Sequence, residues 1–260
     1  MVFTYQWKRD GAAIVGATKA TYTPVAADNG KKVTVTISGS KTGFTSVAKT
    51  SVAATVAPGA LTAPVPTITG VHEVGSVLRV ATGAWSPATA TLTYQWLRDG
   101  VTIAGATSAS YTPVAGDVSK KITVRVSGAQ SAYTSVAKTS VAGAAVVAAK
   151  LTAPVPTFAG TAKVGSTLKA TPGTWGPAPV TIKYQWMRNG TAIIGATGAS
   201  YTQVAADAGK KISVQVTGTK TGYSTASKTS VAGGVVAVGT LTAPAPTVAG
   251  TAKVGSVLKA

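Results

Sequence analysis

The chain contains no cysteine, a single histidine and few acidic residues, and each shortage excludes a class of function. Without cysteine there can be no disulfide, thiolate metal site or cysteine nucleophile. The only histidine is His72, and the corresponding repeat positions hold Ala162 and Ala252, so a catalytic triad or a histidine metal site lacks its minimum set of groups. The sequence therefore predicts a protein that is not an enzyme and holds no cofactor.

Long apolar runs are also absent. The longest apolar stretches, such as residues 141–149, fall well short of the roughly 20 residues that a membrane-spanning helix needs. We therefore expect no transmembrane segment.

The shortage of acidic residues leaves the chain strongly basic, with 24 Lys and Arg against 6 Asp and Glu and a formal net charge of +18. This favours anionic partners such as glycans or cell-wall polymers, although lysine on strands also protects sheets from aggregation. One lysine pair recurs in each repeat, and these pairs are candidate polyanion contacts or solvated loops. Motifs that read bases are missing, so sequence-specific nucleic-acid binding is not expected. The candidate contacts are Lys31, Lys32, Lys120, Lys121, Lys210 and Lys211.

What the chain does contain is the composition of short strands and turns. Valine, alanine and threonine dominate, with 29 Gly and 13 Pro, and 45% of the residues are hydrophobic. Three markers repeat with a period of about 90 residues, which indicates tandem modules. The markers are Leu-Thr-Ala-Pro from Leu61, Leu151 and Leu241, Tyr-Gln-Trp from Tyr5, Tyr94 and Tyr184, and Lys-Thr-Ser from Lys49, Lys138 and Lys228.

Each repeat predicts about seven strands separated by turn signals. Expected strands include residues 64–69, 75–82 and 91–98, a short pair at 103–107 and 110–112, an alternating strand from Lys121, and a last strand ending at Val231 in the third module. Tyr94 and Trp96 share one face of their strand, which should be the core. The pattern indicates an all-β chain of tandem immunoglobulin-like β-sandwiches.

Several linked motifs of the third repeat also resemble a known family. They are Val164-Gly-Ser with Trp175, Tyr184-Gln-Trp186, Asn189-Gly190 and Asp207-Ala-Gly-Lys-Lys. Together they resemble bacterial, actinobacterial-type immunoglobulin-like repeats of secreted and cell-surface proteins. The resemblance covers essentially the whole chain, and it implies stalks, spacers, adhesins or glycan-associated appendages outside the cell.

The repeated acids and tryptophans have structural interpretations. Asp28, Asp117 and Asp207 occur once per module before a strand, where a loop hydrogen bond to nearby backbone amides is expected rather than an acid pair or a calcium site. Tryptophans on the third strand of each module are expected in the core. Trp85 and Trp175 lie in loops between Gly and Pro, where a ligand contact stays open as an alternative.

The repeat divides the chain into unequal parts. Residues 1–60 form a partial module that lacks its first two strands, 61–150 and 151–240 form complete modules, and 241–260 supply the first two strands of a further one. One hypothesis is that 241–260 completes the first module of the next copy by strand addition. The other is that the sequence is a piece of a longer array. The candidate self-association residues are Phe3, Tyr5 and Trp7, facing Val248, Val254 and Leu258.

These patterns predict a non-catalytic structural protein, secreted or on the cell surface, that forms a rigid stalk or fibre and polymerises head to tail. The valine- and alanine-rich connectors favour stiffness over flexibility. The alternative is an adhesive repeat region of a larger secreted protein that binds anionic glycan or cell-wall polymer.

Overall fold

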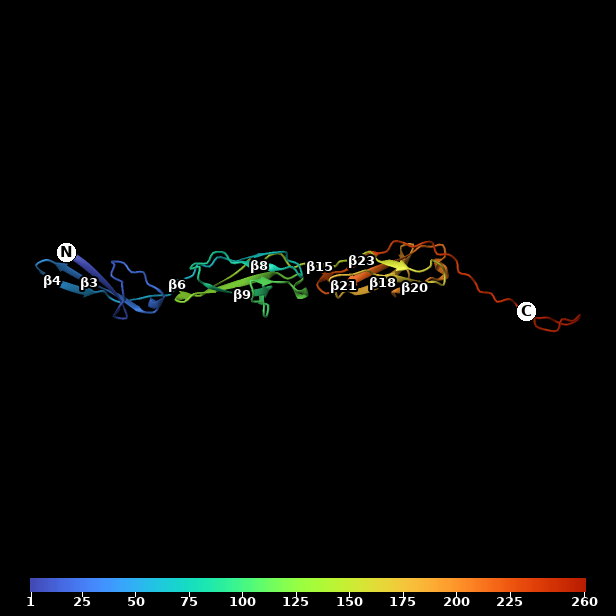
Figure 1. Cartoon of the computed structure of the whole chain (residues 1–260), viewed down its shortest axis with the longest axis horizontal. Helices are drawn as coiled ribbons and strands as arrows, with labels where there is room; N and C mark the ends of the chain where they lie inside the picture. The colour runs from blue at the N-terminus through green and yellow to red at the C-terminus, as the bar shows by residue number, and fades with distance from the viewer. The chain divides into compact units, whose positions relative to one another are not determined.

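The computed structural model describes all 260 residues, and its regular structure consists of β-strands and three short 3-10 turns (Figure 1). No helix is long and apolar enough to cross a membrane. The chain divides into two compact units, Met1–Ala148 and Ala149–Ala260. The all-β expectation is confirmed.

The first module is a single sheet. Its strands run in the order β2-β1-β3-β4, and β5 pairs with β3. All pairs are antiparallel, and β1 meets β3 from Val2 opposite Ser40 to Arg9 opposite Val33. The elements are β1 (Val2–Arg9), β2 (Ala12–Ala13), η1 (Ala26–Asp28), β3 (Lys32–Lys41), β4 (Phe44–Thr50) and β5 (Ala54–Thr55).

The second module has two sheets, ordered β10-β9-β12-β14 and β11-β8-β7. The short strand β6 precedes this module in the chain and pairs in parallel with its strand β13. Its elements are β6 (Gly59–Ala60), β7 (Thr67–Thr69), β8 (Leu78–Ala81), β9 (Thr91–Arg98), β10 (Val101–Thr102), β11 (Ser110–Tyr111), η2 (Ala115–Asp117), β12 (Ile122–Ala129), β13 (Tyr133–Thr134) and β14 (Val136–Thr139).

The third module repeats this topology, with sheets β19-β18-β21-β23 and β16-β17-β20 and a β15 that pairs with β22. Its elements are β15 (Ala149–Lys150), β16 (Thr157–Ala159), β17 (Thr167–Thr171), β18 (Thr181–Arg188), β19 (Thr191–Ala192), β20 (Ser200–Thr202), η3 (Ala205–Asp207), β21 (Ile212–Thr219), β22 (Tyr223–Ser224) and β23 (Ala226–Thr229).

The core of each complete module lies between its two sheets, because alternate residues of each strand point inward. In β12, Ile122, Val124 and Val126 are fully buried while the residues between them are not. Trp96 and Trp186 are also fully buried, as the shared parity with the preceding tyrosines predicts.

The structure corrects three strand predictions. The strand expected at 64–69 begins at Thr67, because Pro64 and Pro66 have no amide to donate. Residues 103–107 form a turn and do not pair with residues 110–112 as expected. Instead, β10 pairs with β9 in one sheet and β11 pairs with β8 in the other. The last strand ends at Thr229: the Ser230 amide still donates to the Val214 carbonyl at 2.9 Å, but the Val214 amide donates to the Ser230 hydroxyl at 3.0 Å rather than to a backbone carbonyl.

One buried aspartate ties the loop to the sheet in each module. Its carboxylate accepts hydrogen bonds from an arginine Nε at 2.5–2.6 Å, a tyrosine hydroxyl at 2.6–2.7 Å and a backbone amide at 2.7 Å. The expected loop bond to a backbone amide is confirmed, and the arginine and tyrosine are additional. The clusters are Arg9, Tyr22, Val25 and Asp28; Arg98, Tyr111, Val114 and Asp117; and Arg188, Tyr201, Val204 and Asp207.

These contacts shift the pKa values of aspartate and tyrosine side chains in the clusters. Burial alone would raise the pKa of Asp207, but hydrogen bonds from Tyr201, the Val204 amide and Arg188 together outweigh it and hold that pKa below its usual value. The same balance lowers the pKa of Asp28. Burial, followed by the hydrogen bond to Asp117, raises the pKa of Tyr111 to about 12.

We predict that Asp207→Asn lowers the free energy of unfolding of the third module by about 2 to 4 kcal/mol, because the amide cannot accept all three donors and leaves a buried donor unpaired. Hydrogen exchange of the β21 amides in the whole chain measures this loss. The control is Asp99→Asn, an exposed turn residue that is already asparagine at position 189, for which a change under about 0.5 kcal/mol is expected. Equal effects of the two changes would contradict the structural role of Asp207.

We also predict a pH dependence with two edges. The lowered pKa of Asp207 stabilises the folded state fully above the unfolded pKa of about 3.9, and this contribution is lost as the pH falls through the folded value. The raised pKa of Tyr111 stabilises the second module fully below pH of about 10, and this contribution is lost as the pH rises toward 12. Urea midpoints measured across pH should show a plateau between these limits. A urea midpoint that rises as the pH falls below this plateau would contradict the prediction for Asp207.

Candidate functional site

The first module leaves uncovered the face that a second sheet covers in the complete modules. Trp7 of β1 is partly exposed, whereas its counterparts Trp96 and Trp186 are fully buried. On the same sheet Phe3 is 54% exposed and Ile37 is 37% exposed, although the counterpart of Ile37 in β12, Val126, is fully buried. An exposed apolar sheet face of this kind is a candidate surface for contact with another β-element.

This face already has the local structure of a complete module. The Trp7 ring stacks on Tyr22 at a centroid distance of 5.6 Å, as Trp186 stacks on Tyr201 at 5.8 Å. Trp7 Nε1 donates to the Lys19 carbonyl at 3.0 Å, and the aspartate cluster of Asp28 is intact. Because the surface is already ordered, little conformational entropy is lost when a partner binds.

The C-terminal segment, residues 241–260, forms the matching piece. Ala249 and Lys259 exchange two backbone hydrogen bonds of 2.8 and 2.9 Å. The same register joins Ala159 to Lys169 in the third module, where these strands belong to a complete sandwich. The structure therefore has one isolated bridge in this segment, in the register of β16 and β17, instead of the two strands expected there.

The candidate contact residues of this hairpin are exposed. Val248 is 69% exposed, Val254 103% and Leu258 47%. Their counterparts in the third module pack into the core: Phe158 meets Trp186 edge-on at 5.6 Å, Val164 packs against the core cluster, and Leu168 is 2% exposed. The position equivalent to Val248 thus touches Trp186, the counterpart of Trp7, and the positions equivalent to Val254 and Leu258 pack in the same core cluster.

At the far end of the uncovered face, the first module has a cavity where the complete modules have the indole of a loop tryptophan. Phe3, Ile37, Phe44 and Val47 line a cavity of about 490 Å³ there, beside Gly39. At the equivalent glycines of the complete modules, Gly128 and Gly218, an added Cβ would overlap the indole of Trp85 or Trp175. Phe3 therefore lies by the tryptophan socket, at the opposite end from the residues that the hairpin would cover.

The loop tryptophans belong to the core. Trp85 and Trp175 are each 8% exposed, and Trp175 Nε1 donates to the Pro172 carbonyl at 3.0 Å. The alternative of an exposed ligand-stacking platform is wrong for both residues.

The six lysines of the recurring pairs are all exposed, but they are not equally free. Lys31 pairs with Asp10 at 3.3 Å and Lys120 with Asp99 at 3.1 Å, so a turn aspartate partly neutralises one lysine in each of these modules. In the third module Asn189 occupies this turn position and accepts the Lys211 amide, and Lys210 forms no ion pair. The positive charge is therefore least compensated in the third module.

The comparisons with known proteins concern the fold. No family and no curated protein matches the sequence. A Ca2+-stabilized adhesin of an Antarctic bacterium, described as binding ice, matches at 15% identity over 95% of this chain and 67% of its own, with a TM-score of 0.37. The tandem Ig repeats of Dlar match at 14% identity over 68% of this chain and 96% of theirs, with a TM-score of 0.21.

The three N-terminal domains of the highly immunogenic outer capsid protein of bacteriophage RB49 match at 17% identity, over 88% of this chain and 86% of that one, with a TM-score of 0.25. At these identities the likeness concerns the fold alone. The sheet pairings show the expected fold, tandem immunoglobulin-like β-sandwiches, with the last of the seven expected strands divided into β13 and β14 in the second module.

Proposed function

We propose that this chain is a non-catalytic extracellular structural protein, a cell-surface stalk or fibre whose copies join head to tail. In each contact, residues 241–260 of one copy complete the first module of the next. The observation that supports the proposal is complementarity: the first module lacks the strands that correspond to β16 and β17, and residues 241–260 correspond to those strands and have one bridge in their register.

The third module gives the pairing expected between copies. There, Leu168 of β17 lies opposite Tyr201 of β20, with Thr167 opposite Thr202. By the same register, Leu258 pairs with Tyr22 of the next copy. Residues 21–23 belong to no strand in the first module, so their backbone groups are available for strand addition.

Side-chain size also matches the hairpin to this module. In the third module the Phe158 ring lies against Gly233, where an added Cβ would be 2.9 Å from it. The first module has one residue fewer in this connector, and Ala54 pairs directly with Val33. The hairpin has Val248 at the position of Phe158 and therefore needs no glycine to make room for a ring.

The energetics favour assembly that depends on concentration. Burying the three aliphatic side chains of the hairpin contributes about 5 to 9 kcal/mol at 1.5–3 kcal/mol each. Association costs about 4 to 15 kcal/mol in lost freedom, with the new strand bonds adding to the favourable side. Because the contact joins two different surfaces, it produces open chains unless the rotation between copies closes a ring.

We predict that Leu258→Asp abolishes this assembly, since it places a charge against Trp7 and Tyr22 of the next copy. The matched control is Val257→Asp: its counterparts Val77 and Thr167 are exposed, so position 257 faces solvent after donation. Light scattering and negative-stain microscopy of the purified chain should show filaments for the wild type and for Val257→Asp, and monomers for Leu258→Asp.

A second measurement keeps the test independent of filament length. A peptide of residues 241–260 should bind a chain lacking those residues and should increase the protection of the Trp7 indole from solvent. A wild-type chain that stays monomeric at all attainable concentrations, or two aspartate variants that behave alike, would refute strand donation.

A second candidate function is binding of anionic glycan or cell-wall polymer, favoured by the net charge of +18 and by the unpaired Lys210. Many weak contacts with phosphate or sulfate groups give salt-dependent binding. On this reading the third module contributes most.

We predict that Asn189→Asp weakens binding to dextran sulfate and lowers its salt dependence, because the new carboxylate would neutralise Lys210 as Asp99 neutralises Lys120. The reciprocal control, Asp99→Asn, should strengthen binding. Affinity measured from 50 to 300 mM salt tests both, and binding that is unchanged by either variant would exclude a role for the lysine pairs.

A further inference from the structure

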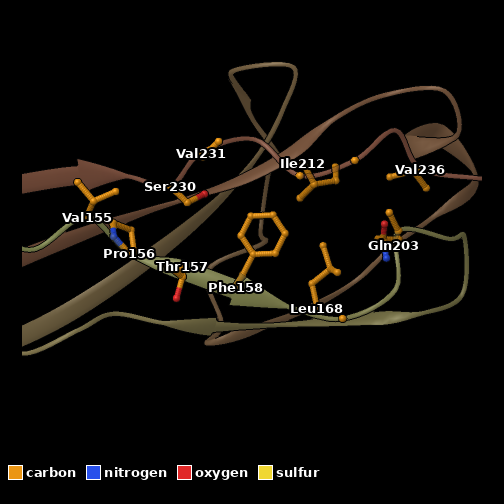
Figure 2. A pocket seen from close by; sticks show the side chains of 14 residues that line it. Val155, Pro156, Thr157, Phe158, Leu168, Gln203, Ile212, Ser230, Val231 and Val236 are labelled. Atoms are coloured by element: carbon orange, nitrogen blue, oxygen red, sulfur yellow. The ribbon is translucent and has the colours of Figure 1, made fainter.

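The third module is covered by two successive parts of the chain. Its first two strands, β16 and β17, place Phe158 and Leu168 toward Ile212 at one end of β21 (Figure 2). The lining of a cavity of about 470 Å³ at that end includes Ala162 and Gln203. At the other end of β21, the indole of Trp175 lies so close to Gly218 that an added Cβ would overlap it. Trp175 belongs to the tryptophan loop, residues 171–179, so β16 and β17 alone do not cover that end.

The first module is open at the corresponding end. Gly39 of β3 is the counterpart of Gly218, and the cavity of about 490 Å³ beside it is the tryptophan socket, whose lining includes Phe3, Ile37, Phe44 and Val47. A Cβ added at Gly39 would be 3.3 Å from Phe3 Cε1 and would not overlap it, whereas at Gly218 it would overlap an indole. The Phe3 ring therefore does not approach the glycine as closely as a loop tryptophan does.

A lysine in the socket lining matches the backbone of a tryptophan loop. In the third module, Lys220 Nζ donates to the carbonyls of Pro177 and Ala178, both at 2.8 Å, within that loop. Lys41 is the counterpart of Lys220 and lines the socket. Each Nζ lies over the aromatic ring three residues later, 4.9 Å from the ring centroid in the first module and 5.3 Å in the third. The socket thus has a cation placed like the one that holds the loop in the third module.

The C-terminal segment lacks the contacts that a tryptophan loop gives to its module. In the third module, Thr152 and Gly176 exchange two backbone hydrogen bonds of 2.8 and 3.2 Å. Thr242, the counterpart of Thr152, belongs to no bridge. Leu241 is 95% exposed, whereas its counterpart Leu151 is 9% exposed. The first module and the C-terminal segment therefore miss contacts with the same kind of loop.

We propose that the partner of the first module is a pair of strands that continues into a tryptophan loop, with its indole in the socket and two of its carbonyls on Lys41. Trp175 follows Leu168 by seven residues, so the partner's indole follows the residue equivalent to Leu258 by the same interval. The loop needs no acceptor from the sheet, because Trp175 Nε1 donates to the Pro172 carbonyl within it at 3.0 Å. This inference rests on the proposed strand donation, since the loop reaches the socket as the continuation of a donated strand.

Three fluorescent peptides test the proposal on the full chain with Leu258→Asp, which leaves the first module unchanged and disables the chain's own donor segment. The first peptide is residues 241–260, the second continues with the sequence of residues 171–179, and the third is the second with Trp175→Ala. Fluorescence anisotropy should show that the second peptide binds at least about tenfold more tightly than the other two, because only it buries an indole.

Two changes in the first module separate the contacts of the loop. Gly39→Ala should remove the advantage of the second peptide and leave the first peptide unaffected, because the new Cβ fits beside Phe3 but overlaps an indole. Lys41→Gln, which gives the residue of the second module, should weaken the second peptide about threefold to tenfold through the lost charged hydrogen bonds. The charge-matched control is Lys49→Gln, whose counterpart Lys228 does not bind the loop, and it should change neither peptide.

The outcomes distinguish this inference from strand donation itself. If all three peptides bind equally, the tryptophan loop is wrong and strand donation stands. If the advantage of the second peptide survives Gly39→Ala, the indole is not in the socket and the inference is overturned. If no peptide binds, strand donation is refuted and this inference with it.

Discussion

Each of the two complete modules depends on covering one apolar sheet face with a second sheet. The tryptophan of β9 or β18 loses all contact with water only because the hairpin of the module's first two strands lies over it, with Leu78 or Leu168 buried beside it. Chains without disulfides must obtain this stability from packing. In the first module, where no second sheet lies over this face, Phe3 is 54% exposed and Ile37 is 37% exposed.

The aspartate cluster explains why the first module keeps its shape without that cover. Asp28 is fully buried although the sheet above it is missing, since Arg9, Tyr22 and the Val25 amide satisfy it locally. The loop that contains Tyr22 and Val25 is thus held in position by polar contacts, although the apolar face beside it is not covered. A partner that binds an ordered surface loses less of its binding free energy to ordering.

The sequence predicted the fold well because alternation and parity are local signals. The buried positions of β12 and the burial of Trp96 follow from them directly. The arginine and tyrosine partners of the aspartate were missed because they lie 19 and 6 residues away. Their recurrence in register in all three modules was the available signal, since Arg98 and Tyr111 repeat with the same spacing as Asp117.

The sequence could not show which side chains share a cavity. Gln203 and Ala162 are far apart in the sequence, and only the folded module brings both into the lining of one cavity. The same holds for Asn189, whose effect on Lys210 depends on a turn contact. What each of these residues contacts depends on which side chains the fold brings close to it, and the identity of the residue alone does not predict those contacts.

Departures from the repeat therefore carry more functional information than the repeat itself. The shared residues build the sandwich in every module, and a residue that builds all copies cannot distinguish one copy from another. Val248 is smaller than Phe158, and the first module lacks the connector glycine that accommodates Phe158. In the proposed assembly a phenylalanine at position 248 would place its ring against the shorter connector, so the smaller valine is the side chain that the proposal requires there.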